Sequence, residues 1–147
     1  MKIRSYLLKS WIVTLIVAAT SVWAQDLRTT PDATQEIKPF SHSEFVRAQK
    51  EKKGIVLYVS ASWCGHCRNQ EPILRTVAQQ EMFKDVVFFV LNYDSSREFL
   101  RTLGIRAVPA VIIFQGEVEK DRFIGRTDQG KIEELLQKAT YKEESLN

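Results

Sequence analysis

The apolar residues of the chain fall into short runs that predict four β-strands. Ile55–Ser60 is rich in β-branched residues and is predicted to be a central strand. Val86–Leu91 is continuously apolar, as expected for a strand that is covered on both faces. Ala110–Phe114 and Val118–Ile124 are separated by Gln115-Gly116-Glu117, which predicts a tight turn. The chain is therefore expected to form two separate strands followed by a hairpin.

Helices are predicted before, between and after these strands. Ser41 and Glu44 fit a capping box for the first helix. Phe45 and Ala48 then lie on one helix face, and Gly54 is expected to be the C-cap. A second helix is expected from residue 65 to about 81, with a kink at Pro72. A third is expected from residue 95 or 96 to 103, closed by Gly104, and a fourth from residue 127 or 128 onward. This order predicts an α/β fold, with a central mixed β-sheet and helices on both faces.

The predicted domain covers residues 40–140. Residues 25–39 combine turn formers and charges with little periodicity, which predicts a flexible leader or a poorly paired first strand. Residues 141–147 are expected to be a frayed tail.

The N-terminal residues have the pattern of a signal peptide, predicted at 1–24. Lys2, Arg4 and Lys9 form a basic segment, and Trp11–Ala24 is an apolar stretch of 14 residues. Val22-Trp23-Ala24 fits a signal-peptidase site, so we expect a periplasmic or otherwise exported protein that is cleaved near Ala24. The stretch is short for a membrane span, which needs about 20 residues, and an uncleaved N-terminal membrane anchor is the alternative.

The charge balance argues against nucleic acid as a partner. The whole chain has 21 basic and 18 acidic residues, and its formal net charge is +3. Residues 1–24 hold three basic and no acidic residues, so cleavage would leave 18 of each sign. The mature chain would then lack the net positive charge that nucleic-acid binding relies on.

The two cysteines of the chain, Cys64 and Cys67, follow the predicted central strand and open the next helix. Unpaired N–H groups at a helix N-terminus favour negative charge, and the thiolate is the reactive form of cysteine. A structural disulfide that closes so short a loop would contribute only about 2 kcal/mol. Redox chemistry therefore explains the pair better than stability does. Metal binding is the alternative, although a closed zinc site needs four ligands and the chain has two cysteines and two histidines.

The residues around the cysteines resemble the thioredoxin family. The run Trp63-Cys64-Gly65-His66-Cys67 looks like the family's active-site motif, in the form with Gly-His between the cysteines that protein disulfide isomerases carry. Pro72 falls where family members kink the next helix, and Val108-Pro109 resembles the approach to the family's cis-proline. Gly116 and Gly125 fit the hairpin and the glycine after the last strand. The resemblance spans about residues 40–139 and implies a thioredoxin fold.

The resemblance implies a role for each residue of the motif. Cys64 would be the exposed nucleophile that attacks a disulfide of a protein substrate, and Cys67 would resolve the mixed disulfide. Trp63 would shield the site, Gly65 would let the substrate backbone approach, and His66 would place positive charge beside the Cys64 thiolate. No cofactor and no metal are implied beyond the redox-active disulfide of Cys64 and Cys67.

The resemblance also implies a substrate-binding element at Val108 and Pro109. A cis bond between them would present the Val108 backbone to an extended substrate, in a form of strand addition. Only about 5–6% of X–Pro bonds in folded proteins are cis, so the sequence alone would favour trans.

Two positions depart from the pattern of many thioredoxins. Tyr58 stands six residues before Cys64, where those proteins have a buried acid that moves the proton of the second cysteine. Val90 stands where a lysine is often near that acid. Glu71, one helical turn after Cys67, is the nearest acid in sequence. Proton transfer at Cys67 is therefore expected to rely on water.

The leading hypothesis is an exported thiol–disulfide oxidoreductase that acts on protein disulfides as a monomer. The compact domain has no evident insertion or dimerisation module, which favours a reductant that receives electrons from a membrane thiol-redox partner. His66 favours the alternative of a disulfide oxidant or isomerase, because stabilising the thiolate makes the pair more oxidising. Two other classes of function stay open. One is a metal-binding or metal-delivery protein with Cys64, Cys67 and a histidine as ligands, and the other is a non-catalytic interaction domain.

Overall fold

The computed structural model of the chain describes residues 35–140, which all belong to the unit Ala33–Asn147. The predicted signal peptide at 1–24, residues 25–34 of the predicted leader and the predicted tail at 141–147 lie outside the described residues and stay predictions. No helix within residues 35–140 has the length and apolar character that crossing a membrane would need.

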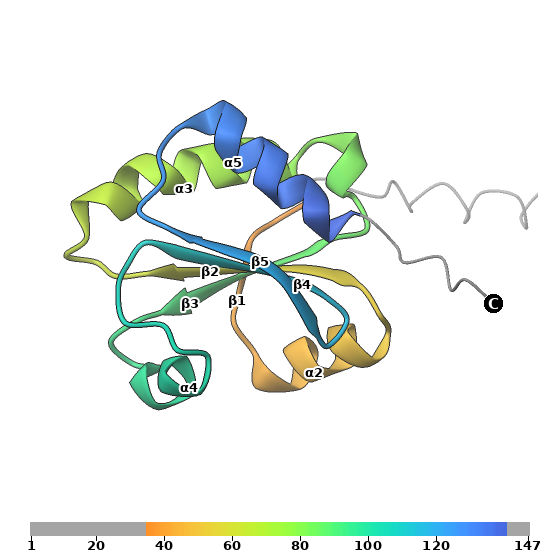
Figure 1. Cartoon of the computed structure of the whole chain (residues 1–147), viewed down its shortest axis with the longest axis horizontal. Helices are drawn as coiled ribbons and strands as arrows, with labels where there is room; N and C mark the ends of the chain where they lie inside the picture. Colours follow the sequence, from red (N-terminus) through yellow and green to blue (C-terminus); the bar gives the residue numbers. More distant parts are fainter. Residues whose placement is uncertain (1–34, 141–147) are drawn as a thin grey trace, which may run out of the picture. The chain divides into compact units, whose positions relative to one another are not determined.

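The described residues form a mixed sheet whose strand order is β1-β3-β2-β4-β5 (Figure 1). The strands are β1 (Lys38–Pro39), β2 (Gly54–Ser60), β3 (Val87–Asn92), β4 (Ala110–Gln115) and β5 (Val118–Ile124). β1 and β2 run parallel to β3, whereas β4 is antiparallel to β2 and β5 is antiparallel to β4. The predicted parallel half and hairpin half of the sheet are both confirmed.

Helices cover both faces of this sheet, as Figure 1 shows. α2 (His42–Lys50) and α4 (Arg97–Thr102) pack on one face, and α3 (Gly65–Ala78) and α5 (Gln129–Leu136) pack on the other. Two short 3-10 helices follow α3 and α5, namely η1 (Glu81–Phe83) and η2 (Gln137–Ala139). The predicted α/β architecture, which is the thioredoxin fold, is confirmed.

β2 lies in the middle of the sheet, and its side chains alternate between two apolar cores. Val56 and Tyr58 belong to the core under α3 and α5, whereas Ile55 and Leu57 belong to the core under α2 and α4. Successive side chains of a strand point to opposite faces, so each position of β2 belongs to one core. Tyr58 therefore lies on the face of the sheet that α3 covers, and α3 contains Cys67.

The predicted bounds are wrong at two element ends. Ile37 is only 4% exposed and Lys38–Pro39 pairs with β3, so the folded domain begins before residue 40. This part of residues 25–39 is a short first strand, so the alternative prediction of a poorly paired strand is confirmed there. α3 ends at Ala78 rather than near residue 81, because the chain turns into η1 and places Phe83, which is fully buried, in the core.

The predicted C-cap role of Gly54 is also wrong. α2 ends with Glu51 as its C-cap, and Lys52 adopts the left-handed backbone conformation with a φ of 54°. Gly54 is the first residue of β2, where a Cβ atom would lie 1.8 Å from the carbonyl oxygen of Ala139. Close packing against η2 therefore explains this glycine.

Replacing Gly54 with Ala is expected to destabilise the protein by about 1–3 kcal/mol, because the backbone at Ala139 has to move to admit the methyl group. Gly130→Ala in α5 is the matched control, since the nearest atom to its Cβ would be Asp128 Oδ1 at 3.8 Å. That change is expected to stabilise the protein by up to about 1 kcal/mol. Urea unfolding measures both effects, and a Gly54→Ala variant as stable as the parent chain would contradict this packing.

Candidate functional site

Cys64 and Cys67 lie where α3 begins, directly after the loop that follows β2. They form a disulfide bond, and their Cα atoms are 5.3 Å apart. Cys64 is the N-cap residue of α3, and its Sγ accepts a hydrogen bond of 3.1 Å from the backbone N–H of Cys67. The first N–H groups of a helix have no partner within the helix and carry partial positive charge. The sulfur of Cys64 therefore lies where negative charge is stabilised.

The two cysteines are more buried than predicted. Cys64 is 5% exposed and Cys67 is 2% exposed, and both belong to the apolar core under α3. The prediction of an exposed Cys64 is wrong for the disulfide form, because the first turn of α3 packs into this core. Trp63 and Gly65, on either side of Cys64, are both exposed. The disulfide is thus buried, while the residues on either side of Cys64 are exposed.

Trp63 stands on the surface and is held by the segment that follows β3. Its side chain is 62% exposed, and its Nε1 donates a hydrogen bond of 2.8 Å to Asp94 Oδ2. Its ring meets Tyr93 edge to face, with the ring centroids 6.2 Å apart. Hydrogen bonds from Arg97 and, to a smaller extent, from Trp63 hold the pKa of Asp94 below its usual value. Asp94 thus anchors Trp63 beside the disulfide.

Gly65 and His66 begin the first turn of α3, and both are exposed. The nearest atom to a Cβ on Gly65 would be Nη2 of Arg68, at 3.7 Å. Nothing in the described chain therefore requires glycine at this position, and the space beside it is open to a molecule that binds there. The side chain of His66 makes no hydrogen bond, ion pair or ring contact within residues 35–140.

Val108 and Pro109 lie at the same end of the sheet as the cysteines. The peptide bond between them is cis, as the resemblance implied. Ala110 pairs with Val59, so Pro109 lies next to the end of β2, from which residues 61–63 lead to Cys64. Val108 is half-buried and packs against both cores, and the carbonyl oxygen of Pro109 accepts a hydrogen bond of 2.9 Å from Gly125. The structure therefore brings both predicted parts of the site together.

Tyr58 lies directly behind the second cysteine. It is 1% exposed, and its hydroxyl donates a hydrogen bond of 3.1 Å to the carbonyl oxygen of Cys67. Burial raises the pKa of Tyr58 above its usual value, so the hydroxyl stays protonated at neutral pH. Val90 is the neighbour of Tyr58 on β3. Tyr58 thus holds the backbone at Cys67 but supplies no acidic group.

A cleft of about 380 Å³ opens beside Cys67 and was not predicted from the sequence. Ser60, Asn92 and Glu71 are among the residues that line it. Glu71 forms an ion pair with Arg75, with Oε1 2.6 Å from Nη2, and makes no hydrogen bond to Cys67. The cleft therefore gives solvent access to the region of Cys67, while the nearest acid in sequence is paired with an arginine.

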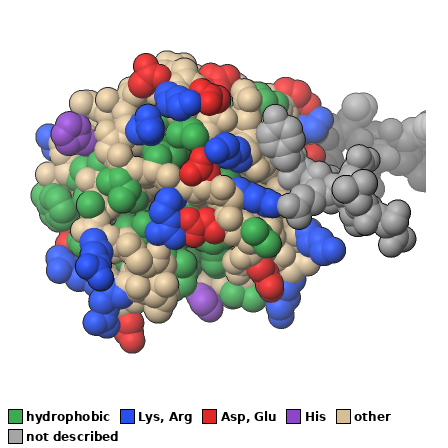
Figure 2. Space-filling model, viewed as in Figure 1, with side chains coloured by type: hydrophobic (Ala, Val, Ile, Leu, Met, Phe, Trp, Pro, Cys, Tyr) green, Lys and Arg blue, Asp and Glu red, His purple; other side chains and the backbone are tan. Residues whose placement is uncertain are grey.

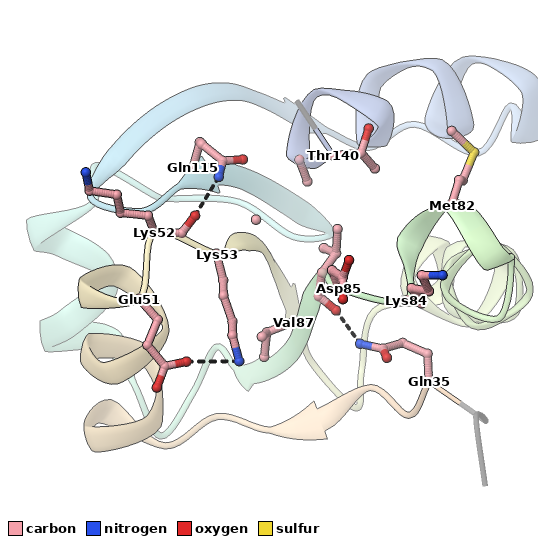
Figure 3. Close-up of a pocket in the computed structure, with 13 residues that line it drawn as sticks. Gln35, Glu51, Lys52, Lys53, Met82, Lys84, Asp85, Val87, Gln115 and Thr140 are labelled. Atoms are coloured by element: carbon pink, nitrogen blue, oxygen red, sulfur yellow. Dashed lines mark hydrogen bonds and ion pairs between the residues drawn. The ribbon is translucent and has the colours of Figure 1, made fainter. Parts of the chain in front are cut away.

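A second cleft, of about 440 Å³, lies at the opposite end of the sheet (Figure 3). Gly54 at the start of β2 and Gln115 at the end of β4 are among its lining residues. Lys53 pairs with Glu51, and the Gln115 amide donates to the carbonyl oxygen of Lys52. The side-chain oxygen of Gln115 is buried and has no hydrogen-bond partner within the described residues, and the lining contains no cysteine or histidine. This cleft is separate from the candidate site.

Sequence reasoning missed Tyr93 and Asp94, which hold Trp63. They follow β3, which is the parallel neighbour of β2. Because the carboxyl ends of parallel strands meet at one edge of a sheet, residues that follow the two strands come together. Within residues 35–140, no three His, Cys, Asp or Glu side chains are placed to hold a metal ion.

Comparison with known proteins agrees with this geometry. A family model described as Thioredoxin matches residues 34–138. Chloroplastic thioredoxin M4 of Arabidopsis thaliana is 31% identical over 116 residues, which are 78% of this chain and 60% of that protein. The thioredoxin of Mycoplasmoides gallisepticum is 36% identical over 84 residues, which are 57% of this chain and 82% of that protein.

Solved structures show the same fold. The crystal structure of Trxlp from Edwardsiella tarda has a TM-score of 0.65 at 27% identity, over 69% of this chain and 98% of that one. Thioredoxin F from spinach chloroplast has a TM-score of 0.64 at 24% identity, over 74% of this chain and 97% of that one. The chain spans about 60% of the length of the Arabidopsis and rice relatives that it matches. Because the family model covers nearly all of the described residues, the chain belongs to the thioredoxin family.

Proposed function

We propose that the protein is a thiol–disulfide oxidoreductase that exchanges disulfides with protein substrates. The observation that carries this proposal is the hydrogen bond from the N–H of Cys67 to the Sγ of Cys64 at the start of α3. This hydrogen bond places the Sγ of Cys64 where a thiolate is stabilised. The disulfide places the Sγ of Cys67 within bonding distance of it. Membership of the thioredoxin family supports the same chemistry.

The reaction proceeds in two exchanges. In the reduced protein, the Cys64 thiolate attacks one sulfur of a substrate disulfide, which forms a mixed disulfide and releases the other substrate sulfur as a thiolate. The Cys67 thiolate then attacks the Sγ of Cys64, which restores the Cys64–Cys67 bond and releases the second substrate thiolate. Two electrons pass to the substrate. The N-cap position and the larger exposed fraction of Cys64 support this order.

The proton of Cys67 has to leave before the second exchange. The Tyr58 hydroxyl donates to the carbonyl oxygen of Cys67, and its raised pKa makes it a poor acceptor of that proton. Glu71 is engaged by Arg75. We therefore assign the proton to water that enters the cleft beside Cys67.

Substrate binding is assigned to the surface that carries Trp63 and Val108. The half-buried Val108 backbone can pair with an extended substrate segment, in the manner of an added strand. Trp63 is exposed beside Cys64, and Gly65 leaves space for the substrate backbone. His66 would stabilise the Cys64 thiolate through its positive charge when it is protonated.

We further propose an exported, monomeric protein that works as a reductant and receives electrons from a membrane thiol-redox partner. The pattern of residues 1–24 supports export, and cleavage near Ala24 remains the proposed maturation step. Short connections between the elements of residues 35–140 support a domain without a substrate-capture insertion. His66 favours the oxidant or isomerase alternative, so the direction of electron flow needs its own test.

Cys64→Ser is expected to abolish reduction of insulin disulfides, because it removes the attacking sulfur. Cys67→Ser is expected to accumulate mixed disulfides between Cys64 and the substrate, because the resolving sulfur is missing. Turbidity measures the reduction, and non-reducing electrophoresis with mass spectrometry detects the mixed disulfides.

Ser43→Ala, an exposed change on α2, is the control and should keep full activity. Activity that survives Cys64→Ser would contradict the mechanism. Acid quenching of growing cells followed by alkylation tests the direction of electron flow. If Cys64 and Cys67 are mostly reduced in the cell, the proposed role as a reductant is supported; if they are mostly oxidised, the protein is an oxidant instead.

Acid is expected to release Trp63 from Asp94. Since the pKa of Asp94 in the folded protein lies below the usual 3.8, the contact is complete above that pH and is lost as the pH falls through the lower folded value. In a chain with Trp11→Phe and Trp23→Phe, Trp63 emission should change with a midpoint below 3.8, while far-UV circular dichroism stays constant. An Asp94→Asn variant should lose this transition, and an unaltered transition in that variant would disprove the contact.

A further inference from the structure

A basic cleft of about 400 Å³ lies next to the candidate site. Tyr93, Arg97, Leu100, Arg101, Ile105 and Arg106 line it, and we call it the arginine cleft. Leu100 is 1% exposed and Ile105 is 2% exposed, so they form an apolar floor. The three arginines are exposed and form the rim. Figure 2 shows Lys and Arg side chains gathered near α4, at the lower left of the view.

The positive charge of the arginine cleft is largely uncompensated. No aspartate or glutamate lines it. The guanidinium groups of Arg101 and Arg106 make no hydrogen bond or ion pair within residues 35–140. Arg97 pairs with Asp94, but that carboxylate also accepts the hydrogen bond from Trp63. Glu98, the acidic residue of α4, lines a different cleft. An anionic ligand would therefore meet at least two free cations.

The arginine cleft is connected to Trp63 of the candidate site through Tyr93. Tyr93 lines the cleft, touches Trp63 with its ring, and donates its hydroxyl to the carbonyl oxygen of Arg106 at 3.2 Å. Arg106 precedes Val108 by two residues. The Arg97 guanidinium lies 5.3 Å from the centroid of the Tyr93 ring. The Arg97 guanidinium is therefore within about 12 Å of the ring of Trp63, the residue before Cys64, and this length matches three to four residues of an extended chain. The Tyr93 hydroxyl connects Arg106 to the same region.

We propose that the arginine cleft binds acidic side chains of the substrate, so that the protein prefers disulfides with aspartate or glutamate a few residues from the attacked cysteine. This inference rests on the proposed disulfide exchange. A carboxylate pairs with arginine in a fork-shaped geometry, which two unpaired guanidinium groups can provide. The apolar floor would accept the methylene groups of a glutamate or a neighbouring apolar residue.

Exposed ion pairs are screened by salt, because the Debye length is about 10 Å at 0.1 M ionic strength and about 3 Å at 1 M. The preference for acidic substrates should therefore be large at low ionic strength and nearly absent at high ionic strength. A preference that came from the apolar floor alone would not depend on salt in this way.

The test compares two synthetic disulfide peptides that differ only at the third and fourth positions from the cysteine, with Glu-Glu in one and Gln-Gln in the other. The second-order rate constant for oxidation of the full, reduced chain is measured for each peptide by stopped flow at low and at high salt. At low salt the acidic peptide is expected to react about threefold to tenfold faster than the neutral peptide, a ratio in the range of two exposed ion pairs.

The double variant Arg101→Gln with Arg106→Gln should bring this ratio close to one. Lys50→Gln is the control for net charge: it removes one positive charge, against two in the double variant, from an exposed residue at the end of α2. This residue is near the start of β2, whereas the cysteines follow the end of β2. It should keep the ratio of the parent chain. Circular dichroism and urea unfolding show whether each variant keeps its fold.

The outcomes separate this inference from the proposed function. If neither peptide oxidises the reduced chain, the proposed disulfide exchange is wrong. If both peptides react at equal rates, or if the double variant keeps the ratio of the parent chain, the arginine cleft does not select substrates. An equal loss of the ratio in Lys50→Gln would show an effect of net charge and would overturn the inference as well.

Discussion

The hydrogen bond from the N–H of Cys67 to the Sγ of Cys64 connects the fold of this protein to its chemistry. It forms because Cys64 takes the N-cap position of α3, a place where serine, threonine, asparagine or aspartate more often accepts such a bond. β2 determines where that helix starts. Its side chains are buried on both faces, so its register with the neighbouring strands cannot shift by a residue without exchanging the two faces. Tyr58, which points from β2 to the carbonyl oxygen of Cys67, adds a second tie between strand and helix.

The reactive groups of the site are buried, whereas the groups that a partner can contact are exposed. The disulfide and Tyr58 lie in the core under α3, in surroundings that are apolar and contain no carboxylate bonded to either sulfur. The groups available to a partner, Trp63 and the arginines around α4, lie on the surface and are connected through Tyr93. Tyr58 supplies no carboxylate behind Cys67, and we therefore propose that water in the cleft beside Cys67 takes its proton.

Local signals explain why much of the fold could be predicted from the sequence. The apolar runs of β2 and β4 depend on neighbouring residues alone. So does the predicted start of the last helix at residue 127 or 128, where Asp128 accepts a hydrogen bond from the backbone N–H of Lys131. Gly54 was misread because a glycine after a basic helix end looks the same whether it caps the helix or packs against Ala139, which is far away in sequence. The burial of Cys64 and the contact of Asp94 with Trp63 depend on packing and on the pairing of β3 with β2, which sequence order does not give.

The central claim is that the N-terminus of α3 makes the Cys64 sulfur the reactive one. It is tested most directly by alkylating the fully reduced chain with iodoacetamide at pH 7 and following each cysteine by mass spectrometry, with the urea-unfolded chain as the reference. The account predicts that Cys64 is labelled first in the folded protein, whereas both cysteines react at similar rates when the helix is absent. Labelling of Cys67 before Cys64, or equal labelling in the folded protein, would contradict the account.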